Sequence, residues 1–211
     1  MRVEAAAVSK AFGDRSVLTD INVSLDANGI TAITGPSGAG KSTLLAIIGG
    51  AMRPDHGTVT IHREGTAHPA SSRFTAWVPQ GSNALPHRTV RDNAAIGALS
   101  RGTDWDEAYA AADEALERVK LGRLLHHRAK QLSGGELQRL SFARALCAER
   151  PLILADEPTA NLDEENTRGI ADILRGLAGH SAVIVATHDP LMIAAADQVI
   201  DVRRLNHHDA A

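Results

Sequence analysis

A glycine-rich stretch in the first quarter of the chain has the residue types needed to bind phosphate. Residues 35–42 satisfy the P-loop pattern G-x-x-x-x-G-K-[ST]. Small residues let successive backbone N–H groups converge on phosphate oxygens, and the positive end of a following helix points to the same place. We expect Lys41 to reach the β- and γ-phosphates of a nucleotide and Ser42 to ligate Mg²⁺. The predicted binding residues are Gly35, Pro36, Ser37, Gly38, Ala39, Gly40, Lys41, Ser42 and Thr43.

Two adjacent carboxylates, Asp156 and Glu157, come directly after the apolar run 152–155. Such a run predicts a buried strand, and in α/β sheets the carboxyl end of a strand meets the ligand crevice. Alone, the pair would indicate only a solvated acidic turn. Beside a P-loop, two carboxylates at a buried strand end indicate a metal ion or a reacting water, because burying an unpaired carboxylate is costly. We assign Asp156 to Mg²⁺, through water, and Glu157 as the base that polarises the attacking water.

The segments around these motifs predict the elements that position them. Runs without polar alternation at 30–34, 152–155 and 182–186 predict buried strands, and helices are expected at 43–48, 137–148 and 164–177. Buried strands separated by helices imply a parallel sheet covered on both faces, so the fold class is α/β with a P-loop NTPase core.

Two further parts are expected beside this core. Segments 3–8 and 21–25, with a β pair at 58–62 and 74–78, suggest a small antiparallel β subdomain. Between about 85 and 131 the pattern is helical, and the acidic residues of 104–107 suit the first turn of a helix. We therefore predict a single ATP-binding domain over residues 1–211, with an inserted helical subdomain at about 85–131.

Composition excludes several other classes of protein. The chain has 211 residues, 44% of them hydrophobic, and a formal net charge of -3, so neither disorder nor nucleic-acid binding is expected. Cys147 is the only cysteine, which excludes a disulfide framework, and we expect it to pack as a small hydrophobe. No signal peptide and no apolar run of about 20 residues is found, which predicts a cytoplasmic chain.

A third motif, Leu-Ser-Gly-Gly-Glu at 132–136, would alone indicate only a capped helix start, because Ser133 and Glu136 form a capping box. Together with the two motifs above, it resembles the signature motif of the ATP-binding subunits of ABC transporters. The resemblance extends over nearly the whole chain. Gln80 resembles the Q-loop glutamine that joins Mg²⁺ to the helical subdomain, and residues 161–163, ending in Asp163, resemble the D-loop.

Two more positions follow the same family pattern. His188 resembles the switch histidine that contacts the γ-phosphate, and Phe12 lies where the family places an aromatic ring on adenine, although tyrosine is more usual there. The resemblance therefore implies Glu157, His188 and Gln80 as catalytic residues. Ser42, Gln80 and Asp156 are the implied Mg²⁺ residues.

The family resemblance also implies an assembly. Ser133 and the backbone amides of Gly134 and Gly135 form a second anion site at a helix start, which completes the nucleotide pocket only from another chain. Two ATP molecules would thus be held between the two chains of a head-to-tail dimer, either a homodimer or a pair of different ATPase subunits. The implied partner is a transmembrane permease, which would hold this chain peripherally on the inner face of the cell membrane. Residues 154–163 and 44–50 are similar to the lipoprotein-release and macrolide-export type.

Two alternative functions remain at this point. A soluble ABC-type ATPase acting on DNA or ribosomes would usually carry inserted coiled coils, zinc modules or a second ATPase copy, and this chain has none of them. A P-loop kinase of small substrates would explain residues 35–42 but leave the motif at 132–136 and His188 without a role. The energy-coupling ATPase of a membrane transporter is the leading hypothesis.

Overall fold

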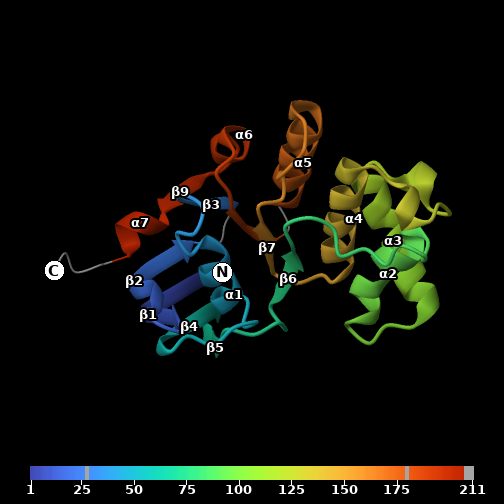
Figure 1. Cartoon of the computed structure of the whole chain (residues 1–211). Helices are drawn as coiled ribbons and strands as arrows, with labels where there is room; N and C mark the ends of the chain where they lie inside the picture. The colour runs from blue at the N-terminus through green and yellow to red at the C-terminus, as the bar shows by residue number, and fades with distance from the viewer. Residues whose placement is uncertain (27–28, 179–180, 207–211) are drawn as a thin grey trace.

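An antiparallel sheet is built mainly from the N-terminal part of the chain (Figure 1). The computed structural model describes residues 1–26, 29–178 and 181–206. The strand order of this sheet is β2 (Arg15–Asp26), β1 (Arg2–Phe12), β4 (His56–Arg63) and β5 (Thr66–Pro69). In β1, Val3 and Ala5 are buried on either side of the partly exposed Glu4, so one face of the sheet packs on the core. A two-residue turn joins β1 to β2 and sets Phe12 opposite Arg15.

The second sheet is parallel and holds the predicted core strands. Its order is β6 (Thr75–Val78), β7 (Leu152–Asp156), β8 (Ala182–Ala186), β3 (Ile30–Thr34) and β9 (Gln198–Asp201). The central strand β7 divides its side chains between two hydrophobic cores. Leu152 and Leu154 pack in one core, and Ile153 and Ala155 pack in the other. Burial on both faces explains why β7 has an unbroken apolar run, and the predicted parallel sheet is confirmed.

The expected pairing of segments 58–62 and 74–78 in one antiparallel layer is wrong. Residues Thr75–Val78 form β6, which runs parallel to β7 and pairs Ala76 with Ile153. Strand β4 pairs instead with β1 and β5. A short apolar segment indicates a strand, but its partner is decided by the core that its buried side chains join. Ala76 and Val78 join the core on the helical side of the parallel sheet.

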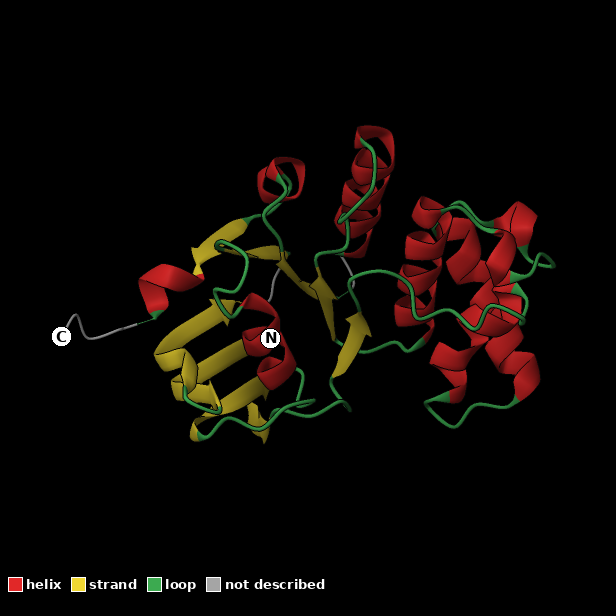
Figure 2. Cartoon of the chain, viewed as in Figure 1, coloured by secondary structure: helices red, strands yellow, loops and turns green. Residues whose placement is uncertain are grey.

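Helices cover both faces of the parallel sheet (Figure 2). Helix α1 (Lys41–Ile48) buries Leu44, Leu45 and Ile48 in the core shared by the antiparallel sheet and one face of the parallel sheet. Helix α5 (Glu164–Leu177) buries Ile170 and Leu174 in the other core. The short helices α6 (Pro190–Ala194) and α7 (Val202–Leu205) precede and follow β9, and neither was expected from the sequence.

Three helices form a separate layer at one end of the molecule, next to β6 (Figure 1). They are α2 (Val90–Leu99), α3 (Trp105–Arg118) and α4 (Gly134–Cys147), with two 3-10 turns at Gly122–Leu124 and Ala129–Gln131. Asp104 caps α3, as the acidic segment indicated, and Cys147 is buried in α4, as expected. Because α4 packs on both α2 and α3, the helical layer extends past residue 131. The domain division proposed from the sequence stays a prediction.

None of the helices within the described ranges combines the length and the apolar character needed to cross a bilayer.

Candidate active site

The P-loop follows β3 and ends in a helix start that has no side-chain cap. Gly40 is the N-cap residue of α1 with φ of 93°, and the first turn of α1 contains no acidic residue. A Cβ at Gly40 would lie 2.7 Å from Leu18 Cδ2, so a larger residue would be both strained and crowded there. The unpaired amides of this first turn and the positive end of the helix dipole are therefore left for an anion.

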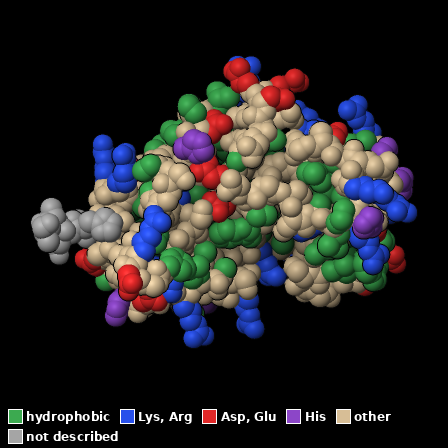
Figure 3. Space-filling model, viewed as in Figure 1, with side chains coloured by type: hydrophobic (Ala, Val, Ile, Leu, Met, Phe, Trp, Pro, Cys, Tyr) green, Lys and Arg blue, Asp and Glu red, His purple; other side chains and the backbone are tan. Residues whose placement is uncertain are grey.

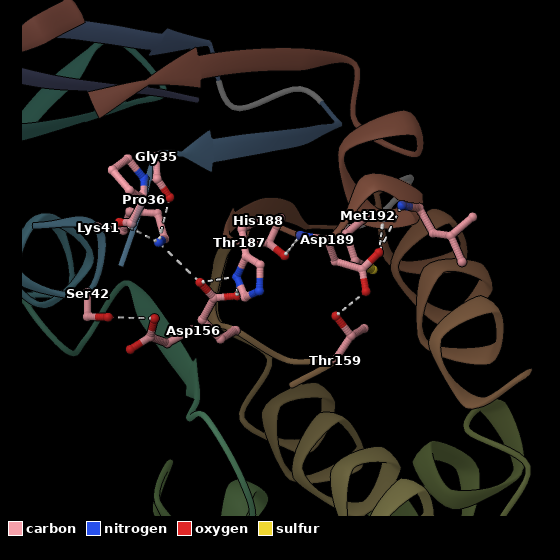
Figure 4. Close-up of polar contacts among 12 residues, drawn as sticks. Gly35, Pro36, Lys41, Ser42, Asp156, Thr159, Thr187, His188, Asp189 and Met192 are labelled. Atoms are coloured by element: carbon pink, nitrogen blue, oxygen red, sulfur yellow. Dashed lines mark hydrogen bonds and ion pairs between the residues drawn. The ribbon is translucent and has the colours of Figure 1, made fainter. Parts of the chain in front are cut away.

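Lys41 is held inside the P-loop rather than extended into solvent. Its side chain is buried, and Nζ donates to the carbonyl oxygens of Gly35 at 2.9 Å and Pro36 at 3.3 Å. The same Nζ lies 3.2 Å from Oε1 of Glu157 (Figure 4). A phosphate entering the loop would exchange these partners for its own oxygens. The ammonium group is thus already positioned for phosphate before nucleotide binds.

Asp156 and Ser42 form a pair of oxygen ligands suited to Mg²⁺. Ser42 Oγ donates a hydrogen bond of 2.8 Å to Asp156 Oδ1 (Figure 4). Burial raises the pKa of the Asp156 carboxyl, the charge of Glu157 acts in the same direction, and the Ser42 hydrogen bond opposes them. A bound divalent cation would relieve this cost, and a hydroxyl with a carboxylate matches the ligands that Mg²⁺ prefers. These residues therefore fit the metal that the family resemblance implies.

Glu157 has an unusual backbone conformation at the end of β7. Its φ is 42°, in the left-handed region that non-glycine residues rarely adopt, and its N–H donates to the carbonyl of Ala186 at 2.8 Å. The carboxylate is largely buried and lies 3.0 Å from Nδ1 of His188. The His188 side chain is mostly exposed.

Lys41, Ser42, Glu157 and His188 line one cavity of about 350 Å³, whereas Asp156 contacts Ser42 without lining that cavity itself. Figure 3 shows a histidine beside acidic side chains on this face of the molecule. The cavity collects half of the site residues predicted from the sequence, namely Ser37, Gly38, Gly40, Lys41, Ser42, Thr43, Gln80, Glu157 and His188. Pro36 and Ala39 line an adjoining cavity of about 280 Å³.

The sequence analysis missed two residues that line the P-loop cavity. Arg15 and Val17, from the start of β2, line both cavities. The available signal was Phe12, because Arg15 lies directly opposite it across the β1–β2 turn. Phe12 itself lines neither cavity; its ring is 50% exposed and lies 5.8 Å from Lys10 Nζ. Its proposed contact with adenine stays a prediction.

The residues of the signature motif, 132–136, form a second cluster that does not line the P-loop cavity. Ser133 caps α4, and the helix starts at Gly134 rather than at the expected residue 137. A Cβ on Gly135 would lie 2.3 Å from Oδ1 of Asn166, so a larger residue at position 135 would displace the Asn166 side chain. Asp163 caps α5 by accepting from the backbone N–H of Asn166 at 2.8 Å. The predicted signature and D-loop residues are thus neighbours at two helix starts.

Helix α4 also holds both ends of the segment around Gln80. Gln138 donates to the carbonyl of Pro79 at 3.4 Å, just before Gln80. Arg144 donates to Asn83 Oδ1 at 2.9 Å, just after it. Burial of the Arg144 side chain lowers the pKa of its guanidinium. The helix that carries the signature motif therefore also positions a residue of the P-loop cavity.

Residues 18–160, more than half of the chain, match the ABC transporter family. The lipoprotein-releasing system ATP-binding protein LolD of Shewanella sp. is 36% identical over 214 residues, which cover 95% of this chain and 93% of that protein. The macrolide export ATP-binding/permease protein MacB of Burkholderia lata is 39% identical over 213 residues, and this chain matches 31% of its length.

Solved structures give the same result. The dimeric ATP-binding cassette MJ0796 in a post-hydrolysis state with ADP and Pi superposes with a TM-score of 0.81 at 30% identity, covering 94% of this chain and 93% of that one. A second dimeric structure of MJ0796 also gives a TM-score of 0.81, at 29% identity. These comparisons support a transporter ATPase and not the alternative that acts on DNA or ribosomes. The chain belongs to the ABC transporter family and is an ATP-binding subunit that hydrolyses ATP with Mg²⁺.

Proposed function

We propose that the P-loop cavity binds the triphosphate along residues 35–43, with Lys41 on the β- and γ-phosphates and Ser42 with Asp156 on Mg²⁺. Two contacts at the start of α1 carry this proposal. Lys41 pairs with Glu157, and Ser42 donates a hydrogen bond to Asp156. The metal, when bound, neutralises part of the phosphate charge. Gln80 lines the same cavity, and its side chain would contribute a further oxygen ligand to the metal.

Glu157 is the proposed general base. In the structure its carboxylate is paired with Lys41 and His188, so the arrival of a γ-phosphate would draw Lys41 away and free an oxygen for the attacking water. His188 is mostly exposed, which lets its ring turn toward the γ-phosphate. The rest of the proposed mechanism is positioning, since phosphoryl transfer needs little covalent help from the protein.

The second cluster is the proposed complement of the pocket of another chain. Ser133, Gly134, Gly135 and Asp163 lie at the starts of α4 and α5 and do not line this chain's own P-loop cavity. In a head-to-tail dimer they would close the partner's nucleotide site. Removing the γ-phosphate by hydrolysis would remove the contacts that favour this closed dimer.

A transmembrane permease is the proposed mechanical partner. The similar proteins include one named for a lipoprotein-releasing system and one that combines an ATP-binding part with a permease. No helix in the described part of the chain is suited to cross a bilayer, so the chain would dock peripherally on the inner face of the cell membrane. Residues 83–93, which Arg144 ties to α4, are the proposed docking region.

Two measurements test this function. The purified chain should hydrolyse MgATP, and Lys41→Ala should abolish both binding and turnover. Fractionation of the cells that produce this chain should place the wild-type chain in the membrane fraction, together with a multi-spanning protein. A chain that stays out of that fraction under every nucleotide condition, although it hydrolyses ATP, would overturn the permease partnership.

A further inference from the structure

Arg15 lies over the P-loop although it belongs to none of the recognised motifs. A Cβ built on Gly38 would be 3.3 Å from Nη2 of Arg15, which places the guanidinium directly against the phosphate-binding backbone. Arg15 lines the P-loop cavity and also the adjoining cavity of about 280 Å³. It therefore stands at the boundary between the two.

The hairpin between β1 and β2 fixes this position. Arg15 is the first residue of β2 and pairs with Phe12 across the turn. Residues directly opposite on an antiparallel pair project to the same face, with their Cβ atoms about 5 Å apart. Since Val17 projects to the same face as Arg15 and also lines the cavity, this face of the hairpin forms one wall of the P-loop cavity.

The charge balance of the cavity gives Arg15 a function. Lys41 is already paired with Glu157, so those two charges offset one another before nucleotide binds. Within the described ranges, the Arg15 guanidinium makes no ion pair or hydrogen bond, whereas Arg203 of the adjoining cavity is paired with Asp201 at 2.8 Å. Arg15 is thus a cation that faces the phosphate site without a partner, and a guanidinium binds phosphate oxygens through two parallel hydrogen bonds.

We propose that Arg15 is a further nucleotide-binding residue, whose guanidinium binds the diphosphate part that ATP and ADP share. This rests on the proposed use of the P-loop cavity for the triphosphate. Gln80, Glu157 and His188 line the P-loop cavity only, whereas Arg15 lines the side that continues into the adjoining cavity. Arg15 is accordingly at the end away from the γ-phosphate machinery, and it contributes affinity rather than catalytic rate.

The test is isothermal titration calorimetry of the full chain with MgADP and with a non-hydrolysable ATP analogue. Arg15→Ala should raise Kd about tenfold for both ligands, the scale of a lost charge-assisted hydrogen bond. Arg15→Lys should recover part of the loss, because an ammonium keeps the charge without the two-pronged geometry. Arg203→Ala is the matched control and should stay within about twofold of wild type, since Asp201 already engages that guanidinium.

Salt dependence and stability separate this role from a structural one. Arg15→Ala should show a weaker dependence of Kd on salt than wild type, because one phosphate contact is missing. Its melting temperature should stay unchanged, since the side chain is exposed. A Kd for Arg15→Ala within twofold of wild type, or an equal loss in Arg203→Ala, would overturn the proposal. A wild-type chain that binds neither ligand would instead refute the proposed nucleotide site itself.

Discussion

The starts of helices α1 and α4 both lie within glycine-containing motifs, but they are capped in opposite ways. Gly40 caps α1 without any side chain, and no acidic residue lies in the first turn. Ser133 caps α4 through its side chain, and the Glu136 carboxylate accepts a hydrogen bond of 2.9 Å from the Ser133 backbone N–H. The first site is open to an anion, whereas the second is closed by its own residues.

This difference indicates how the two sites are used. The open amides of α1 gain a partner only when phosphate arrives, so this site favours nucleotide in a single chain. At α4 the capping hydrogen bonds from Ser133 lower the pKa of Glu136, which keeps a negative charge at the helix start. In the proposed dimer, a partner's phosphate that binds Ser133 would have to displace that carboxylate. Closure between chains is therefore expected to be weaker than nucleotide binding within one chain.

Ser133→Arg gives the largest expected effect on the α4 side. A long cation in place of the cap should block the approach of the partner's P-loop. Nucleotide affinity of the single chain should stay within about twofold of wild type, whereas steady-state hydrolysis should fall by at least about 100-fold. A coupled-enzyme assay and nucleotide titration measure the two quantities. Normal turnover in this variant would remove the role given to the signature motif.

Glu136→Gln should strengthen closure between chains. Glutamine preserves the capping box but removes the charge that the incoming phosphate meets. ATP-dependent association should become about tenfold tighter at low salt, and the gain should shrink as salt is added. Light scattering across a concentration series measures it. Glu107→Gln, in the first turn of α3, is the matched control and should leave association unchanged; weaker association in Glu136→Gln would contradict the account.

Asp156→Asn should give the smallest effect, on stability at the P-loop side. Burial raises the pKa of Asp156 above its ordinary value of 3.8, so the folded chain holds that proton more tightly than the unfolded chain. The free energy of unfolding therefore falls as pH rises from 3.8 through the raised pKa, and the ionised group still costs stability at pH 7. The variant should melt roughly 1–2 °C higher at pH 7 without nucleotide, a small gain for a partly solvent-screened group.

The control for this prediction is the pH dependence. Wild type and Asp156→Asn should melt at nearly equal temperatures near pH 4 and diverge as pH rises, while Mg²⁺ should stabilise only wild type in the presence of ADP. A variant that melts lower than wild type at pH 7 without metal would show that the Ser42 hydrogen bond outweighs the cost of burial.

Local patterns were sufficient to predict the parallel sheet and much of the P-loop cavity. Lys41 and Ser42 follow a strand and start a helix, and Asp156 and Glu157 end a strand, so their positions follow from short-range rules. His188 follows β8, which neighbours β7, so it meets Glu157 because the two strands are adjacent. The roles given to these residues stay proposals.

Features that depend on long-range contacts could not be predicted in this way. Arg15 reaches Gly38 only because the β1–β2 hairpin folds over the P-loop. The strand at Thr75–Val78 was expected, but its parallel pairing with β7 depends on which core its side chains join. Likewise, the contact of Arg144 with Asn83 links segments 61 residues apart, and no periodic pattern indicates it.

Sedimentation of Glu157→Gln, with and without MgATP, tests most directly whether two chains must enclose the nucleotide. The variant keeps the P-loop but lacks the proposed base, so hydrolysis should fall by about 100-fold or more and ATP should persist in the site. We predict a monomer without nucleotide and a stable dimer with MgATP. A Glu157→Gln chain that stays monomeric with bound MgATP, or that hydrolyses ATP at the wild-type rate, would contradict the account.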